Sequence, residues 1–470
     1  MSNSDRLMLP VLGALVLAAK LPTMATPYYW DERVWISLVH NLVELPLWRA
    51  LPGCHPPELF GRPPGLYLPT AAVFKLSGAS PWVSHLVICG FAILGVWFTY
   101  RLAALLYGTT AGVLAALFIL FDALYFAQAG MFLADLPVAA TGVASVYWAL
   151  RRRYVPYLLF AVWVVSIKET GMAIVFAISV YVLLTERRRG LVVAARQALP
   201  WAVPMLLMSA YYAAQWATSG GVLIQPHDPI PVFQPHLADI YFRLITHWLF
   251  VAQNRWIFIA LIAANLLAHP AARRRPQLLL FGLIVLCSGY AFTVLYYLPR
   301  YLLPVMPYLY VLAAGALLEL FPRRAVHGPI AVALLLLSAA SLRGVDRPGT
   351  REWDLGYLAA VRTYSRTATR LERDYADARI VALAPMSSYL RKPQLGYVSR
   401  PLQVFSPNDA RFDSSARFDV VVDCILSFGD RDALSSYIDA HGLNAVDRFE
   451  EGSFRCDVYD AQRLTPEHQA

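Results

Sequence analysis

The chain has 470 residues, of which 58% are hydrophobic and only 15% are charged, against about 25% charged residues in soluble domains. This composition excludes an ordinary soluble enzyme and a disordered protein. Residues 1–342 hold 23 Lys and Arg against 12 Asp and Glu, whereas residues 343–470 hold 17 against 19. The basic excess therefore belongs to the apolar part, where arginines cluster at the ends of apolar runs, and it does not indicate nucleic-acid binding.

Eleven apolar segments follow one another along the first part of the chain. We predict that they form transmembrane helices, because about 20 apolar residues cross a bilayer. The fifth and sixth are short for a span. The first precedes Met24-Ala25-Thr26-Pro27, so a cleaved signal peptide is an alternative there, although we prefer an uncleaved span. The segments are 7–24, 81–106, 111–127, 133–150, 155–167, 171–185, 195–218, 249–268, 277–298, 301–320 and 328–342.

The arginine clusters set the predicted orientation of these helices. If the N-terminus is cytoplasmic, every cluster falls on the cytoplasmic side, as the positive-inside rule requires. We therefore predict a multi-pass protein of the inner cell membrane, with Met1 in the cytoplasm and the residues after Leu342 outside. The clusters contain Arg101, 151–153, 187–189, 273–275 and 323–324.

Two long outer loops contrast with the short basic turns inside, and we expect function to lie on the outer face. The first loop, residues 25–80, has apolar residues at helical spacing over 34–43, which predicts an amphipathic helix in the membrane interface. Four polar residues of the second loop, residues 219–248, are His227, Asp228, His236 and His247. They lack a spacing typical of metal ligands, so a solvated loop is favoured over a metal or substrate site.

The composition changes after Leu342, and residues 343–470 predict a small extracytoplasmic α/β domain. No phosphate-binding loop or nucleophile motif appears in it, and we expect it to shape the acceptor side of the site. Cys424 and Cys456 fall on two predicted strands in an oxidising compartment, where a disulfide can form. The sequence does not decide between a disulfide and two free thiols. The predicted elements are helices at 353–375 and 432–441 and strands at 379–384, 419–425, 445–449 and 453–459.

The first outer loop opens with an acidic pair, Asp31 and Glu32, followed by Arg33. One interpretation is a general base with a phosphate-binding cation beside it at the membrane surface. The alternative is a helix N-terminus, where the helix dipole favours acidic residues. The spacing alone leaves both open.

A second acid, Asp135, stands at the predicted outer end of the fourth segment and is followed by Pro137. This pattern also fits a helix start, but Asp135 is predicted to lie at the same depth and on the same face as Asp31. Asp122 lies one turn deeper, and we assign it a structural role, although acids within a membrane tend to be functional.

Four cations are predicted to face outward near the lipid headgroups: Arg33, Arg62, Lys168 and Arg300. The positive-inside rule disfavours cations on that side, so their presence needs a reason. An anionic lipid phosphate supplies one, since guanidinium groups bind phosphate through two hydrogen bonds. For Lys168, which precedes Glu169, simple pairing at the membrane surface is the alternative.

The order of these motifs resembles the polyprenyl-phosphate-sugar-dependent glycosyltransferases of the membrane type-C (GT-C) fold. Within them the chain is most similar to the aminoarabinose lipid A transferases and the protein O-mannosyltransferases, of the glycosyltransferase family 39 type. The resemblance covers the chain to about Leu342. The matching stretches are Asp31-Glu32-Arg33, Arg62-Pro63-Pro64-Gly65-Leu66-Tyr67, Phe74-Lys75-Leu76-Ser77-Gly78, Ala134-Asp135-Leu136-Pro137, Lys168-Glu169 and Arg300-Tyr301-Leu302-Leu303-Pro304-Val305-Met306-Pro307.

The resemblance implies a GT-C transmembrane catalytic domain over 1–342, for which the apolar segments predict about eleven transmembrane helices. The α/β domain over 343–470 is predicted from the composition. It implies that Asp31 is the catalytic aspartate of the first loop and that Asp135 is the second acid near the lipid phosphate. The residues implied to bind the lipid or sugar phosphate are Glu32, Arg33, Arg62, Lys168 and Arg300.

The same resemblance bears on cofactors. The aminoarabinose enzymes carry an acid just before the basic residue of the Pro-Pro stretch, where this chain has Gly61. A metal site of their kind is therefore not implied, and no ligand motif supports a divalent metal. No cofactor is certain from the sequence, and a divalent metal stays open as a possibility.

The predicted function is the inverting transfer of a sugar from a polyprenyl-phosphate carrier to an envelope acceptor, which is a glycan, lipid or protein. Asp31 is expected to act as the base on the extracytoplasmic face. The alternatives are another type-C glycan transferase or ligase, or a polytopic transporter. A transporter predicts charges near the bilayer midplane and paired halves, which the sequence does not show, and a scaffold would not explain the rim of acids and cations.

Overall fold

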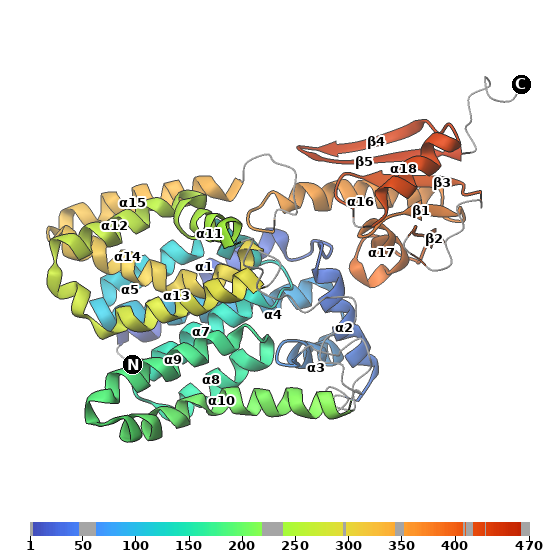
Figure 1. Ribbon diagram of the computed structural model, residues 1–470. Coiled ribbons are helices and arrows are strands. Elements are labelled where there is room, and N and C mark those ends of the chain that lie inside the picture. The colour runs from blue at the N-terminus through green and yellow to red at the C-terminus, as the bar shows by residue number, and fades with distance from the viewer. Residues whose placement is uncertain are drawn as a thin grey trace, which may run out of the picture.

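The computed structural model describes residues 3–46, 63–218, 238–294, 298–343, 352–407, 409, 417–427 and 429–461. A helical body forms most of the chain, and an α/β region lies at one end of it, while the N-terminus lies toward the other end (Figure 1). Each of the eleven apolar segments is helical. Among the described residues, six helices are long and apolar enough to cross a membrane by themselves, so the chain is a multi-pass membrane protein.

The helices of the body follow the apolar segments. The third segment is divided at Asp122 into two helices, and the eighth is kinked at Gln253 and Asn254, which both have a left-handed backbone. The helices are α1 (Asn3–Lys20), α4 (Pro81–Tyr107), α5 (Thr109–Leu120), α6 (Ala123–Gln128), α7 (Asp135–Leu150), α8 (Tyr154–Ile167), α9 (Gly171–Glu186), α10 (Leu191–Thr218), α11 (Ala238–Thr246), α12 (Arg255–Ala268), α13 (Pro276–Val294), α14 (Met306–Leu320) and α15 (Arg324–Ala340).

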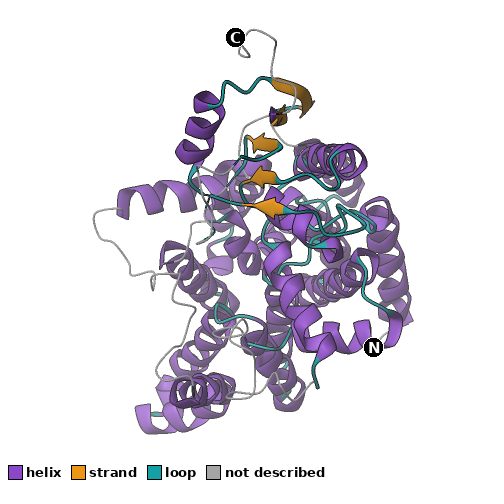
Figure 2. Ribbon diagram, turned by 90° about the vertical axis from the view of Figure 1, so that its right-hand side faces the viewer, coloured by secondary structure: helices purple, strands orange, loops and turns teal. Residues whose placement is uncertain are grey.

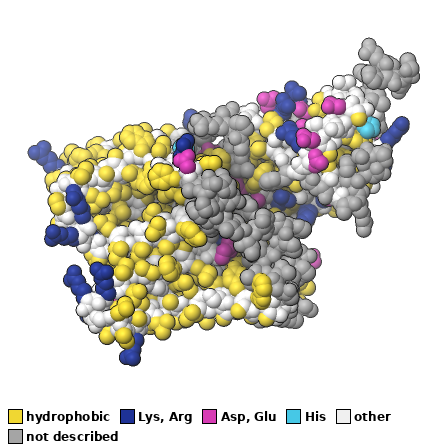
Figure 3. Space-filling model, in the orientation of Figure 1, with side chains coloured by type: hydrophobic (Ala, Val, Ile, Leu, Met, Phe, Trp, Pro, Cys, Tyr) yellow, Lys and Arg dark blue, Asp and Glu magenta, His cyan; other side chains and the backbone are white. Residues whose placement is uncertain are grey.

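The two ends of the body differ in charge. Figure 3 shows lysine and arginine side chains along the end farthest from the α/β region, whereas the flank between the ends is mostly hydrophobic. The arginine clusters lie in the short connections that follow α7, α9, α12 and α14. The apolar flank is therefore bounded on one side by basic turns and on the other by the α/β region.

The first long loop forms two further helices, α2 (Glu32–Glu44) and α3 (Tyr67–Ser77). The amphipathic helix expected over 34–43 is confirmed as α2, but its apolar side chains pack inside the protein. The Trp35 ring stacks on that of Tyr67 from α3, with ring centroids 5.7 Å apart. The buried apolar residues of α2 are Trp35, Ile36, Leu38, Val39 and Leu42.

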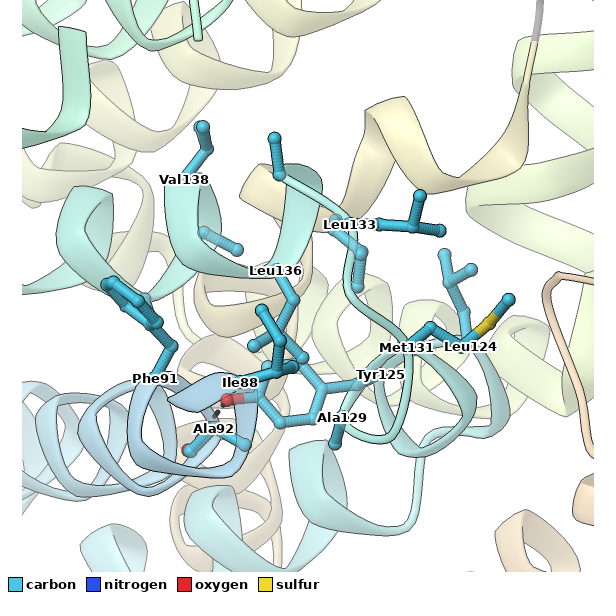
Figure 4. Packing of buried hydrophobic residues seen from close by; sticks show 14 of the residues in the cluster. Ile88, Phe91, Ala92, Leu124, Tyr125, Ala129, Met131, Leu133, Leu136 and Val138 are labelled. Atoms are coloured by element: carbon cyan, nitrogen blue, oxygen red, sulfur yellow. Dashed lines mark hydrogen bonds between the residues drawn. The ribbon is translucent and has the colours of Figure 1, made fainter. Parts of the chain in front are cut away.

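The segment between α5 and α7 is buried from Asp122 to Ala134. Figure 4 shows Tyr125 of α6 reaching α4, where its hydroxyl donates a hydrogen bond of 2.9 Å to the carbonyl oxygen of Ala92. At Gly95, one turn further along α4, a Cβ atom would lie 2.3 Å from the same hydroxyl. The absence of a side chain at Gly95 thus lets this segment pack closely on α4.

The α/β region contains a five-stranded sheet in the order β2-β1-β3-β5-β4, seen from one side in Figure 2. β1, β2 and β3 are parallel, whereas β5 is antiparallel to both β3 and β4. Cys424 and Cys456 face each other across β3 and β5 and form a disulfide. The elements are α16 (Tyr357–Asp374), β1 (Ile380–Ala382), α17 (Met386–Arg391), β2 (Val404–Phe405), β3 (Val420–Cys424), α18 (Arg431–Ala440), β4 (Ala445–Glu451) and β5 (Phe454–Asp460).

Removing the disulfide should destabilise the α/β region. Cys424→Ser should lower its free energy of unfolding by about 3 kcal/mol, because the bond closes a long loop in the unfolded chain. Thermal unfolding of the purified protein measures the loss, and Cys287→Ser, which removes a free thiol, is the control. Peptide mapping of unreduced protein should find Cys424 joined to Cys456, and alkylation of both thiols would contradict this assignment.

Candidate functional site

Asp31 directly precedes α2, but its side chain does not cap that helix. The preceding residue, Trp30, has a left-handed backbone with φ of +50°, and its N–H donates a 2.8 Å hydrogen bond to the hydroxyl of Tyr389. This contact with α17 holds the chain in a conformation that side-chain-bearing residues rarely adopt. The turn points the Asp31 carboxylate toward Arg300 instead of toward the backbone of α2.

Asp135 is the first residue of α7, and the N-terminus of that helix has no side-chain cap. Its carboxylate lies between two cations: Oδ1 is 2.7 Å from Nζ of Lys168, and Oδ2 is 3.1 Å from Nε of Arg300. Both acids therefore stand at a helix start, as the structural alternative expected, but neither side chain caps its helix, and both carboxylates are paired with cations.

Arg300 is the centre of the cluster. It lies in η9 (Pro299–Val305), the short 3-10 helix before α14, and its side chain is 6% exposed. Nη2 is 2.5 Å from Oδ2 of Asp31, Nε lies against Asp135, and Nη1 contacts Oε2 of Glu352. One buried guanidinium thus joins carboxylates from the first loop, from α7 and from the segment before α16.

Lys168 follows α8 and completes the cluster. Besides Asp135, its ammonium group lies 3.9 Å from the centroid of the Tyr301 ring, and the guanidinium carbon of Arg300 lies 5.6 Å from the same ring. A cation over an aromatic face is attracted by the ring quadrupole. Tyr301 therefore helps to hold two like charges next to each other in a buried site.

The members of this cluster differ in access to solvent. The side chains of Asp135, Lys168, Glu352 and Arg300 are between 4% and 6% exposed, whereas that of Asp31 is 32% exposed. Three carboxylates face two cations, so the cluster carries a formal charge of −1 when every group is ionised. An open carboxylate in front of buried cations is an arrangement suited to accepting a proton beside a bound anion.

Glu352 is the site residue that the sequence analysis missed. Burial raises the pKa of its carboxyl to about 8; Arg300 opposes this shift, and the charges of Asp31 and Asp135 add to it. Oε1 is buried and has no hydrogen-bond partner among the described residues. In the sequence, Glu352 is recognisable only as an acid beside Trp353 after the last apolar segment. Its distance along the chain from Arg300 gives no indication that the two side chains meet.

Glu32 lies in a separate buried set. Its carboxylate accepts hydrogen bonds from the backbone N–H groups of Tyr29, at 2.7 Å, and of Phe132, and it lies 3.2 Å from Nε2 of His85. The side chain is 1% exposed. Because Glu32 follows Asp31 and Phe132 precedes Asp135 by three residues, this set ties together the two segments that carry the acids of the cluster.

The remaining predicted cations are placed differently. Arg33 points to α17, where its Nη1 lies 3.2 Å from the Ser388 hydroxyl. Arg62 lies outside the described residues. The stretch that follows it docks on the end of α8, where the N–H of Gly65 donates a 2.6 Å hydrogen bond to the carbonyl oxygen of Ser166. A Cβ atom at Gly65 would lie 2.5 Å from that backbone, so the close approach requires glycine.

Asp122 has the contacts of a structural residue. It accepts a 3.0 Å hydrogen bond from the N–H of Tyr125 and so caps α6. It also forms a buried ion pair with Arg255, whose Nε is 2.9 Å from Oδ2, and accepts a 2.6 Å hydrogen bond from Tyr310. Arg255, which the sequence analysis did not single out, joins α12 to α6 through this pair.

Within the described ranges, no group of three or more His, Cys, Asp or Glu side chains is arranged to hold a metal ion. The carboxylates of the cluster are instead directed at Arg300 and Lys168. His227, Asp228 and His236 of the second loop lie outside the described residues.

Glu32→Gln should destabilise the protein by about 1.5–3 kcal/mol, because a neutral amide is a weaker acceptor for two buried N–H groups than a carboxylate. Thermal unfolding in lipid nanodiscs measures the change. Glu44→Gln, at the exposed end of the same helix, should leave the unfolding temperature unchanged. Equal stability of the two variants would show that Glu32 does not tie these segments together.

No protein-family model matches the chain, and no curated protein matches its sequence significantly. Among solved structures, ArnT from Cupriavidus metallidurans in the apo state is similar over 98% of this chain and 99% of its own, with a TM-score of 0.61 and 16% sequence identity. ArnT from the same organism bound to undecaprenyl phosphate is similar over 96% of this chain and 98% of its own, with a TM-score of 0.56 and 16% identity. The likeness establishes a shared fold, and it confirms the GT-C membrane fold that the motifs implied, together with the C-terminal α/β region that the composition predicted.

Proposed function

We propose that the chain is a membrane glycosyltransferase that moves a sugar from a polyprenyl-phosphate carrier to an envelope acceptor. The observation that carries this proposal is the Arg300 cluster, in which buried cations and an open carboxylate meet. It stands on a fold shared with ArnT, one structure of which holds undecaprenyl phosphate. The fold supports a lipid-phosphate donor, and the cluster supplies groups that suit one.

The charge distribution supports an extracytoplasmic site. Basic side chains gather at the end of the helical body opposite the α/β region (Figure 3), and the positive-inside rule assigns such an end to the cytoplasm. The Arg300 cluster includes Glu352, which precedes the α/β region, and so belongs to the other end. On this assignment the N-terminus is cytoplasmic, and the site faces the periplasmic side of the inner membrane.

Arg300 and Lys168 are suited to hold the phosphate of the donor. During transfer the bond between the anomeric carbon and the phosphate oxygen breaks, and the phosphate keeps the electron pair. Two fixed cations in a buried site stabilise this leaving anion without giving it a proton. Their present partners are carboxylates, so a donor phosphate would take the place of one of these anions.

Asp31 is suited to act as the base. In the proposed step the acceptor oxygen or nitrogen attacks the anomeric carbon, and its proton passes to the Asp31 carboxylate. A single displacement of this kind inverts the configuration at the anomeric carbon. Asp31 is now paired with Arg300, and binding of a phosphate to that guanidinium would release the carboxylate to accept the proton.

The transfer step tests this assignment. Asp31→Asn should lower the rate of sugar transfer by about 10²–10⁴-fold, the usual contribution of a general base, while undecaprenyl phosphate still binds. The donor and acceptor are first identified by mass spectrometry of envelope glycans, lipids and proteins with and without the gene, and transfer is then followed in membranes. Asp377→Asn, at a side chain that is 98% exposed, is the control. Transfer at the wild-type rate by Asp31→Asn would refute the role of Asp31.

Donor binding should weaken as the pH rises through about 8. The Glu352 carboxyl, whose pKa is raised to about 8, then loses its proton and adds a negative charge beside Arg300. Between pH 7 and pH 9 the Kd for undecaprenyl phosphate should increase about tenfold. Glu352→Gln should abolish this dependence, and Glu450→Gln, at an exposed position, should keep it. A pH dependence that persists in Glu352→Gln would contradict the assignment.

A further inference from the structure

A second group of cations lies where the α/β region meets the first loop. Arg33 of α2 donates to the Ser388 hydroxyl at 3.2 Å, and Lys392, directly after α17, donates to the Ser37 hydroxyl at 3.3 Å. Ser37 in turn donates a 2.7 Å hydrogen bond to the carbonyl oxygen of Arg33. Each element thus contributes one cation and one serine to this contact, which we call the α2–α17 contact. Figure 3 shows basic side chains where the α/β region joins the helical body.

Neither cation of the α2–α17 contact has an acidic partner. Among the described residues, no carboxylate lies within ion-pair distance of Arg33 or Lys392, whereas neighbouring Arg391 is paired with Asp409. Partial desolvation at this contact lowers the pKa of Lys392, and the charges of Arg33 and Arg391 lower it further. The positive charges are therefore close enough to repel one another, which costs free energy unless an anion binds between them.

The Arg33 guanidinium also has an unused donor. Its Nε is buried and makes no hydrogen bond to any residue that the structure describes. A buried donor without a partner costs about 1–3 kcal/mol, and an oxyanion would satisfy it. Guanidinium and ammonium groups together bind phosphate or carboxylate through charge-assisted hydrogen bonds.

The location of this pair favours a ligand that approaches from the aqueous side. Lys392 is exposed and belongs to the α/β region, whereas Arg300 and Lys168 lie buried at the ends of membrane helices. Arg33 is two residues from Asp31, so the backbone that carries Arg33 lies within one turn of the acid of the main cluster. A donor that reaches Arg300 from the lipid leaves this second pair for the other substrate.

We propose that Arg33 and Lys392 form an oxyanion-binding site for a phosphate or carboxylate group of the acceptor. The identification of the ligand as the acceptor rests on the proposed function. The binding of an oxyanion by these two residues does not depend on it. The anionic group would orient the acceptor so that its nucleophilic atom faces Asp31. The α/β region would thereby take a direct part in choosing the acceptor.

The test uses the full-length protein in nanodiscs, saturated with undecaprenyl phosphate so that the Arg300 cluster is occupied. Inorganic phosphate is the probe, titrated at constant ionic strength and followed by calorimetry. Arg33→Gln and Lys392→Gln should each weaken phosphate binding about tenfold, because each removes one charged hydrogen-bond donor. Lys392→Arg should retain binding, and Arg417→Gln, at an exposed position of the same region, should not change it.

The outcomes separate this site from the proposed function. If a variant that carries both Arg33→Gln and Lys392→Gln binds phosphate as tightly as the wild-type protein, the oxyanion site is refuted. An equal loss of undecaprenyl-phosphate binding in Arg33→Gln and Lys392→Gln would assign the pair to the donor and would also refute it. If wild-type protein binds no undecaprenyl phosphate but shows the phosphate response and its loss in both variants, the proposed function fails and the oxyanion site stands.

Discussion

The structure depends on one buried positive charge. The Arg300 side chain is 6% exposed, and an ion withdrawn from water to this extent must be paired to be tolerated. Its partners are Asp31, Asp135 and Glu352, which come from three separate parts of the chain. Because one guanidinium contacts all three, the first outer loop, the start of α7 and the segment before α16 meet at one point. The charge that stabilises this arrangement is also the charge that suits a phosphate.

The surrounding hydrogen bonds join the segments that carry the residues of the cluster. Glu32 joins the segment of Asp31 to that of Asp135 through the N–H group of Phe132, and Gln128 donates a 2.7 Å hydrogen bond to the carbonyl oxygen of Glu352. Tyr389 of α17 fixes the backbone at Trp30. The α/β region is therefore a structural part of the site and not an attached module.

The charged side chains of the two groups differ in their exposure to solvent. Lys168 and Arg300 are buried, Asp31 is partly exposed, and Lys392 of the Arg33–Lys392 pair is exposed. On the proposed function, Arg300 and Lys168 would bind the phosphate of the donor, and the Arg33–Lys392 pair would bind the acceptor. The two substrates would then meet at Asp31.

The sequence by itself determined the helical segments and the resemblance to the GT-C fold, because hydrophobic length and arginine clusters respond to the bilayer and not to tertiary contacts. It also singled out Asp31, Asp135, Lys168 and Arg300, since charged residues at the ends of apolar segments share one depth. Only the tertiary structure decided that Asp31 pairs with Arg300, that Glu32 belongs to a neighbouring set, and that Glu352 contacts Arg300 while Lys392 contacts α2. Those assignments rest on contacts between residues up to several hundred positions apart, and no local spacing or periodicity records such contacts.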